Sequence, residues 1–161
     1  MIRGMTTTET LEMGPDEWRT WRELRLAALA EAPEAFGSAL ANWTGAGDTE
    51  VLWRARLSSV PLNLVLTLNG LPVAMVSATA PAADSAVELI SLWVAPEARG
   101  RGVADEAVRQ VIARSAERFP GSRMVLSVKT ANHHATALYE RHGFVDSGPS
   151  PDDANERLMC H

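Results

Sequence analysis

The spacing of apolar residues in the first third of the chain is helical. From residue 18 to residue 29 apolar side chains recur every three or four positions, which predicts an amphipathic helix after a short strand at 9–13. The segment that follows contains Pro33, Gly37, Gly45 and Gly47. These residues predict a turn-rich connection to a second helical stretch at 49–57.

From residue 62 onward the period is that of strands. The runs LNLVLTL and LPVAMVSATA flank Asn69-Gly70, a pair that favours the positive φ angles of a tight hairpin turn. The pattern predicts further strands at 86–94, 123–130, 144–146 and 156–159. It also predicts a helix from about residue 103 that ends before Pro120-Gly121, and a helix at 132–143. Helices followed by a sheet with one strand–helix–strand crossover indicate an α/β or α+β fold, which we expect to be a single domain over 1–161.

Composition narrows the classes of partner. With 161 residues, of which 46% are hydrophobic, the chain can bury one sizeable core. A net charge of −5 argues against a nucleic-acid partner. Cys160 is the only cysteine, so no disulfide forms within the chain, and no run of apolar residues is long enough for a membrane span. We therefore expect a cytoplasmic protein, and the spacing of the four histidines predicts no metal site.

The stretch VAPEARGRGVADEAV, residues 94–108, has the composition of an anion-binding turn. It joins a strand to a helix through Gly100 and Gly102, where glycine lets the backbone approach a ligand. The first N–H groups of the helix and the positive end of its dipole attract negative charge. Arg99 and Arg101 would add guanidinium groups able to hold phosphate oxygens.

The kind of anion is restricted by what the turn lacks. Asp105 stands where the dinucleotide fingerprint needs its third glycine, and no Gly-Lys-Ser or Gly-Lys-Thr follows, so NAD and ATP are not the first choice. Between residues 99 and 123, six arginines face three acidic residues in an otherwise negative protein, which favours an anionic ligand. A solvated glycine-rich loop is the alternative.

At this point the sequence resembles the GCN5-related N-acetyltransferase (GNAT) family. The run Arg99-Gly100-Arg101-Gly102-Val103-Ala104 resembles the cofactor motif of that family. ELISLWVAPEA resembles the fourth strand and the turn after it, and NHHATALYERHGF resembles the helix with the pattern Asn-x-x-Ala-x-x-Leu-Tyr-x-x-x-Gly-Phe. The match covers roughly residues 86–147, and its two motifs occur in the family's order.

The resemblance implies a fold and a cofactor. It implies a mixed, mostly antiparallel sheet of about six to seven strands with helices on both faces, and acetyl-CoA as co-substrate. The pyrophosphate would lie on the N–H groups of residues 99–104, with the pantetheine arm beside Trp93 and Val94 where the fourth and fifth strands splay apart. Asn132 would cap its helix and also bond to the cofactor. Asp105 departs from the family pattern, because a carboxylate there repels phosphate unless it points away.

The resemblance also implies two catalytic residues. Transfer to an amine requires a neutral nitrogen, so a base must take a proton. Glu88, in an otherwise apolar strand, occupies the position of the family's general base, although a glutamate near a strand end could also be solvated. Tyr139, the only tyrosine, matches the general acid that protonates the CoA thiolate, although it could instead be a core aromatic. Ser91 is a further candidate for holding the thioester or a water molecule.

The sequence thus predicts an N-acetyltransferase that uses direct attack in a ternary complex. Its acceptor would be a small-molecule or protein amine, with no nucleic acid and no membrane involved, and the resemblance allows a homodimer. Two alternatives are a catalytically silent acyl-CoA sensor or regulatory domain and a transferase for a longer acyl group. The acidic segment 146–156 could attract an amine or could be a solvated loop.

Overall fold

A computed structural model describes residues 5–33 and 40–161 of the chain. Seven strands form one sheet in the order β1-β2-β3-β4-β5-β7-β6. Their bounds are β1 Thr8–Glu12, β2 Leu62–Leu68, β3 Leu71–Ala78, β4 Ala86–Val94, β5 Arg123–Lys129, β6 Val145–Pro149 and β7 Glu156–Cys160. Only the β4–β5 pair is parallel. The predicted α/β fold with a mixed, mostly antiparallel sheet is confirmed.

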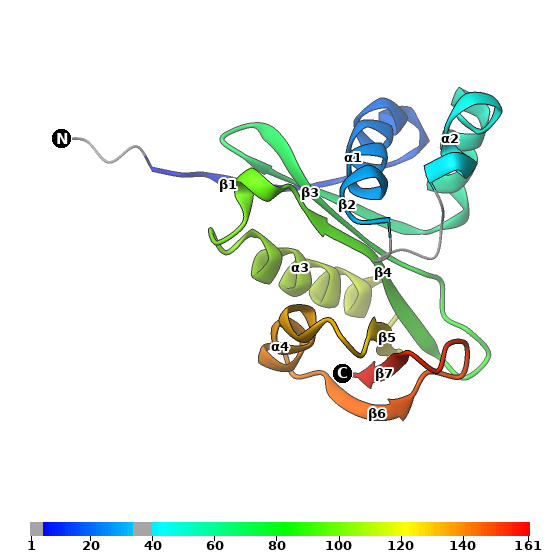
Figure 1. The fold of residues 1–161 in the computed structure, drawn as a ribbon, viewed down its shortest axis with the longest axis vertical. Coiled ribbons are helices and arrows are strands. Elements are labelled where there is room, and N and C mark those ends of the chain that lie inside the picture. Colours follow the sequence, from blue (N-terminus) through cyan, green and yellow to red (C-terminus); the bar gives the residue numbers. More distant parts are fainter. Residues whose placement is uncertain (1–4, 34–39) are drawn as a thin grey trace.

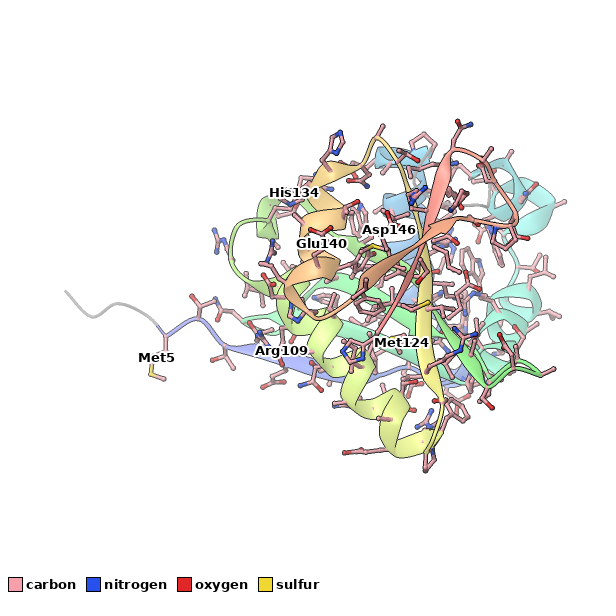
Figure 2. The ribbon with its side chains drawn as sticks, turned by 90° about the horizontal axis from the view of Figure 1, so that it is seen from below. Met5, Arg109, Met124, His134, Glu140 and Asp146 are labelled. Carbon is pink, nitrogen blue, oxygen red and sulfur yellow. The ribbon has the colours of Figure 1, made fainter. Side chains whose placement is uncertain are left out.

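Four α-helices cover the two faces of the sheet. They are α1 Trp18–Glu31, α2 Glu50–Ser59, α3 Val103–Arg118 and α4 His133–Arg141. Figure 1 shows α1 and α2 on one face and α3 and α4 on the other. The same pairing of α3 with α4 is visible from below in Figure 2, where Arg109 and Glu140 mark the two helices. Short 3-10 turns lie at Pro15–Glu17, Leu40–Trp43, Gly45–Gly47 and Pro96–Ala98.

The local signals in the sequence explain these elements. Asn69 and Gly70 both have positive φ, 50° and 82°, so the β2–β3 connection is the tight turn that favours this pair. The side chain of Asn132 caps α4 by accepting a hydrogen bond from the N–H of Ala135 at 3.1 Å, as predicted. The predicted bounds of the elements differ from the observed ones by a few residues. Part of the predicted turn-rich connection, 34–39, lies outside the described residues.

The core fills both sides of the sheet. Trp21 of α1 and Trp53 of α2 are fully buried against one face, while α3 contributes Ala107, Val108 and Val111 to the other. Burial of each large apolar side chain contributes roughly 1.5–3 kcal/mol, so both layers hold the sheet in place. Among the described residues, no helix is long and apolar enough to cross a membrane.

Candidate active site

The sheet opens between β4 and β5. These strands pair only from Ala86 to Glu88, opposite Arg123 to Val125. Just beyond, β4 contains a bulge: Met75 faces Trp93 and Ser77 faces Ile90, so β4 has one residue more than β3 between those pairs. Ser91 lies in this bulge with φ 60°, a left-handed conformation that costs a non-glycine residue about 1–3 kcal/mol. The bulge bends the middle of β4, at the point where it leaves β5.

The turn before α3 exposes a row of backbone donors. Gly100 and Gly102 have φ 75° and 78°, and α3 begins at Val103. Across residues 100–105, no N–H group donates to a protein acceptor in the described part of the chain. These unpaired donors and the helix dipole make the turn a suitable place for a pyrophosphate. The cradle was expected at residues 99–104, but the N–H of Arg99 donates to the carbonyl of Pro96 at 3.3 Å, so the row of unpaired donors begins at Gly100.

The two arginines of this turn have different surroundings. The Nη2 of Arg99 lies 2.9 Å from Oε2 of Glu31, and its Nε donates to the carbonyl of Val94 at 3.1 Å. Trp93 donates to the same Glu31 oxygen at 2.9 Å, so its buried ring is fixed against the end of α1. The hydrogen bonds from Arg99 and Trp93 lower the pKa of Glu31. Arg101 is exposed and contacts no acidic residue in the described ranges, so its charge is available to an anion.

Asp105 points away from the anion-binding turn. His142 Nε2 donates to its Oδ1 at 2.8 Å, and the Arg141 guanidinium lies 3.3 Å from the same oxygen. Partial burial of Asp105 opposes ionisation, but these hydrogen bonds outweigh it and lower the pKa of the carboxyl. The side chain thus joins the start of α3 to the end of α4. Because Arg141 and His142 bind the carboxylate, the contact favours the alternative in which Asp105 points away from a phosphate.

A cavity of about 370 Å³ lies beside the β4 bulge. It brings together the two predicted catalytic residues, Glu88 from β4 and Tyr139 from α4, with Ser91 between them in the lining. The other residues that line it are Arg25, Arg56, Leu89, Ile90, Leu92, Ser127 and Glu156. Trp93, Val94, the turn at 99–104 and Asn132 do not line this cavity. Of the predicted site residues, Glu88, Ser91 and Tyr139 therefore line the cavity, and the anion-binding turn is separate from it.

The cavity shifts the acidity of both predicted catalytic groups. Partial desolvation, together with the carboxylates of Asp152 and Glu156, raises the pKa of Glu88, although its side chain still reaches solvent. Burial also raises the pKa of the Tyr139 hydroxyl, which keeps it protonated at neutral pH. Tyr139 contacts Phe144 edge-on with ring centroids 5.7 Å apart. It is therefore a core aromatic that also lines the cavity. Its role as a general acid stays a prediction.

Two cavity residues were not predicted. Arg25 lies in α1 on the apolar face of the helix, and Arg56 lies in α2. A charged residue among Trp21, Leu24, Ala28 and Leu29 at helical spacing was a signal that Arg25 is buried. No comparable signal marked Arg56.

The acidic segment 146–156 largely pairs within the protein. Asp146 accepts from Arg157 at 2.9 Å, and Lys129 lies 2.8 Å from Asp153 and 3.2 Å from Glu156. Most of its carboxylates are thus already compensated, which favours a structural role for this segment. Among the described residues, no group of three or more His, Cys, Asp or Glu side chains could hold a metal ion.

The sequence also matches a known family. The chain belongs to the Acetyltransferase (GNAT) family, whose sequence model matches residues 17–144. It is thus an acetyltransferase, and members of this family use acetyl-CoA. A search of curated proteins found no match.

Solved structures share the fold over nearly the whole chain. A GNAT acetyltransferase from Streptococcus pneumoniae is 19% identical, with a TM-score of 0.75 and coverage of 96% of this chain and 98% of that one. The PaiA N-acetyltransferase of Thermoplasma acidophilum, in complex with coenzyme A, is 13% identical, with a TM-score of 0.71 and coverage of 96% and 98%. YncA of Salmonella typhimurium, a putative acetyltransferase with its cofactor acetyl-CoA, is 17% identical, with a TM-score of 0.70 and coverage of 96% and 91%.

Replacement of Gly102 tests the anion-binding turn. In Gly102→Ala the new Cβ meets no neighbour, so the cost is the left-handed backbone, about 1 kcal/mol in stability. If the turn relaxes to avoid that strain, its N–H groups lose their alignment, and calorimetry should show acetyl-CoA binding weakened about fivefold or more. Gly121→Ala is the matched control, because Gly121 has φ 81° and equally open space in a turn outside the site. Equal affinity in both variants would exclude the turn as the cofactor site.

Replacement of Asp105 tests its structural role. Since the pKa of Asp105 is lowered in the folded state, its stabilisation is present above the ordinary carboxyl pKa and is lost as the pH falls through the folded value. Asp105→Asn should therefore unfold in urea with about 1 kcal/mol less free energy at pH 7, and the difference should shrink below about pH 4. The exposed Glu117→Gln serves as control. A large gain in acetyl-CoA affinity in Asp105→Asn would show that the carboxylate faces the phosphates after all.

Proposed function

We propose that this acetyltransferase acetylates an amine by direct attack in a ternary complex, with Glu88 as general base and Tyr139 as general acid. The observation that carries the proposal is the shared cavity, in which both side chains border the β4 bulge. The anion-binding turn lies beyond the other end of the β4 segment that leaves β5. This layout provides one place for a nucleotide pyrophosphate and another for an acceptor.

The residues present fit acetyl-CoA. The N–H groups of residues 100–105 and the charge of Arg101 suit its pyrophosphate, and Asn132 caps the neighbouring helix α4. The β4 edge from Trp93 to Val94, no longer paired with β5, suits an extended pantetheine arm. Acetyl-CoA, when bound, supplies an activated acetyl thioester.

The roles of the two catalytic residues follow from their acidities. An alkyl ammonium has no lone pair, and Glu88 with a raised pKa is a stronger base than an ordinary carboxylate, directly or through a water molecule. Glu88 would take the proton of the ammonium before attack, so that the neutral nitrogen can bond to the acetyl carbon, and the second nitrogen proton would leave to solvent. As the carbon–sulfur bond breaks, the electron pair stays on sulfur, and the protonated Tyr139 hydroxyl gives a proton to it.

Removal of the base should slow the chemical step. In Glu88→Gln we expect kcat to fall about 10²–10⁴-fold, because an amide cannot accept the proton. In the native enzyme kcat/KM should fall as the pH drops through the raised pKa of Glu88. This decrease of kcat/KM at low pH should be absent in the variant. Thiol release with a panel of primary amines measures both kcat and the pH dependence of kcat/KM, with Glu117→Gln as control. Acetyl-CoA binding without release from any amine in the native protein would instead favour a sensor domain.

Removal of the acid should spare the fold. The Tyr139 hydroxyl makes no hydrogen bond within the described residues, so Tyr139→Phe leaves no partner unsatisfied and should change the unfolding free energy by under about 0.5 kcal/mol. Its kcat should still fall by about 10²-fold or more, because the thiolate loses its proton donor. Turnover equal to that of the native enzyme would remove Tyr139 from the mechanism and leave only its packing against Phe144.

A further inference from the structure

The acceptor cavity is lined by opposite charges from different elements. Arg25 of α1 and Arg56 of α2 line it together with Glu88 of β4 and Glu156 of β7. Arg25 is buried, Arg56 and Glu156 are partly buried, and Glu88 is exposed. The more a charged group is removed from water, the more it needs a partner of opposite sign or a dense set of hydrogen bonds. The contacts of these side chains therefore indicate which charged groups a complementary acceptor has.

Neutral groups hold Arg56 in position. Its Nη1 donates to Oδ1 of Asn63 at 2.9 Å, its Nη2 to Oγ of Ser77 at 3.3 Å, and its guanidinium lies 5.2 Å from the ring centre of Trp21. Asn63 and Ser77 are buried and bonded to each other at 2.7 Å, so the guanidinium is held by a rigid network. In the part of the chain that the structure describes, Arg56 contacts no carboxylate.

A second cation lies close to Arg56. Arg25 is 7% exposed, and burial lowers its pKa to about 10. Burial, followed by repulsion from Arg25, also lowers the pKa of Arg56 to about 10. Because Arg25 repels the charge of Arg56, an anion bound at the Arg56 guanidinium would stabilise that charge.

The acidic side of the cavity is only partly compensated. Glu156 already shares Lys129 at 3.2 Å. Glu88 has no cationic side chain within salt-bridge distance among the described residues. The lining thus presents the Arg56 guanidinium and the Glu88 carboxylate, neither of which has a partner of opposite charge among the described residues. This pair is complementary to a ligand with one anionic and one cationic group.

We propose that the acceptor is a free amino acid or a close analogue, with its carboxylate at Arg56 and its amine at Glu88. This inference rests on the proposed function, because it assigns Glu88 to the amine. A guanidinium presents paired donors that match a carboxylate. A volume of about 370 Å³ suits a small molecule. The amino terminus of a protein has no carboxylate on the same residue, because that carboxyl group forms a peptide bond. Arg56 is then a specificity-determining residue.

Carboxylate binding can be tested without catalysis. We would measure thermal unfolding in sodium formate and in sodium chloride at equal ionic strength. Formate should raise the Tm of the native protein by about 2 °C more than chloride does. This additional rise in Tm, the formate excess, should vanish in Arg56→Gln. It should persist in Arg54→Gln, a control in the same helix whose exposed side chain pairs with Asp16 and Glu50. No excess in the native protein would overturn the anion site.

A conservative variant covers the case in which Arg56→Gln fails to fold. Arg56→Lys keeps the charge but loses the forked pair of donors, so the formate excess should fall to less than half. An undiminished formate excess in Arg56→Lys would contradict the assignment of the site to Arg56.

The acceptor class is tested with matched trios. Each trio consists of an L-amino acid, its carboxamide and its decarboxylated amine. The trios differ in the side chain of the amino acid, and thiol release from acetyl-CoA is measured for every member. The best amino acid should exceed its own carboxamide and amine at least about tenfold in kcat/KM, and Arg56→Gln should remove this preference through KM. Release from carboxylate-free amines at equal rates would overturn the inference and keep the proposed function. Release from no amine, with the formate excess present, would overturn the proposed function instead.

Discussion

The two halves of the sheet are joined by three parallel residue pairs between β4 and β5, and the rest of the site depends on how short this join is. If β5 followed β4 to Val94, backbone hydrogen bonds would close the opening in which the cavity and the β4 edge are accessible. The bulge at Ser91 prevents this by bending β4 at its middle. The strain at Ser91 is borne by the well-packed layers on either face.

The charged residues around the opening fall into groups that differ in whether a partner of opposite charge already binds them. Asp105 with α4, and Glu31 with Arg99 and Trp93, are compensated pairs that fix the ends of helices and the outer part of β4. Arg101 and the N–H groups that follow it are available to a phosphate. The cavity combines the Glu88 carboxylate with the Arg56 guanidinium, which has only neutral contacts among the described residues. If the proposed function and acceptor are right, this separation allows the protein to hold a polyanionic cofactor and a zwitterionic acceptor at the same time.

Local chemistry made much of the fold predictable. Asn69-Gly70, the cap at Asn132 and the apolar face from Val103 to Ser115 each act within a few residues, so the sequence alone indicated the hairpin, α4 and α3. The contact of Arg99 with Glu31 joins residues 68 apart and depends on where α1 ends relative to β4. Periodicity cannot predict such a contact. Arg25 lies on the apolar face of its helix, but only the packing of α1 beside α2 shows that it lines a cavity with Arg56. The roles of Glu88 and Tyr139 remain predictions that the geometry supports.

Hydrogen exchange at the amides of residues 100–105 tests the central claim most directly, namely that the turn beside the opened sheet holds the cofactor. These N–H groups have no protein acceptor in the described chain and should exchange rapidly in the free protein. With saturating acetyl-CoA they should slow by at least about tenfold, while the equally exposed turn around Gly121 should not change. Unchanged exchange at residues 100–105 with acetyl-CoA bound would contradict the account.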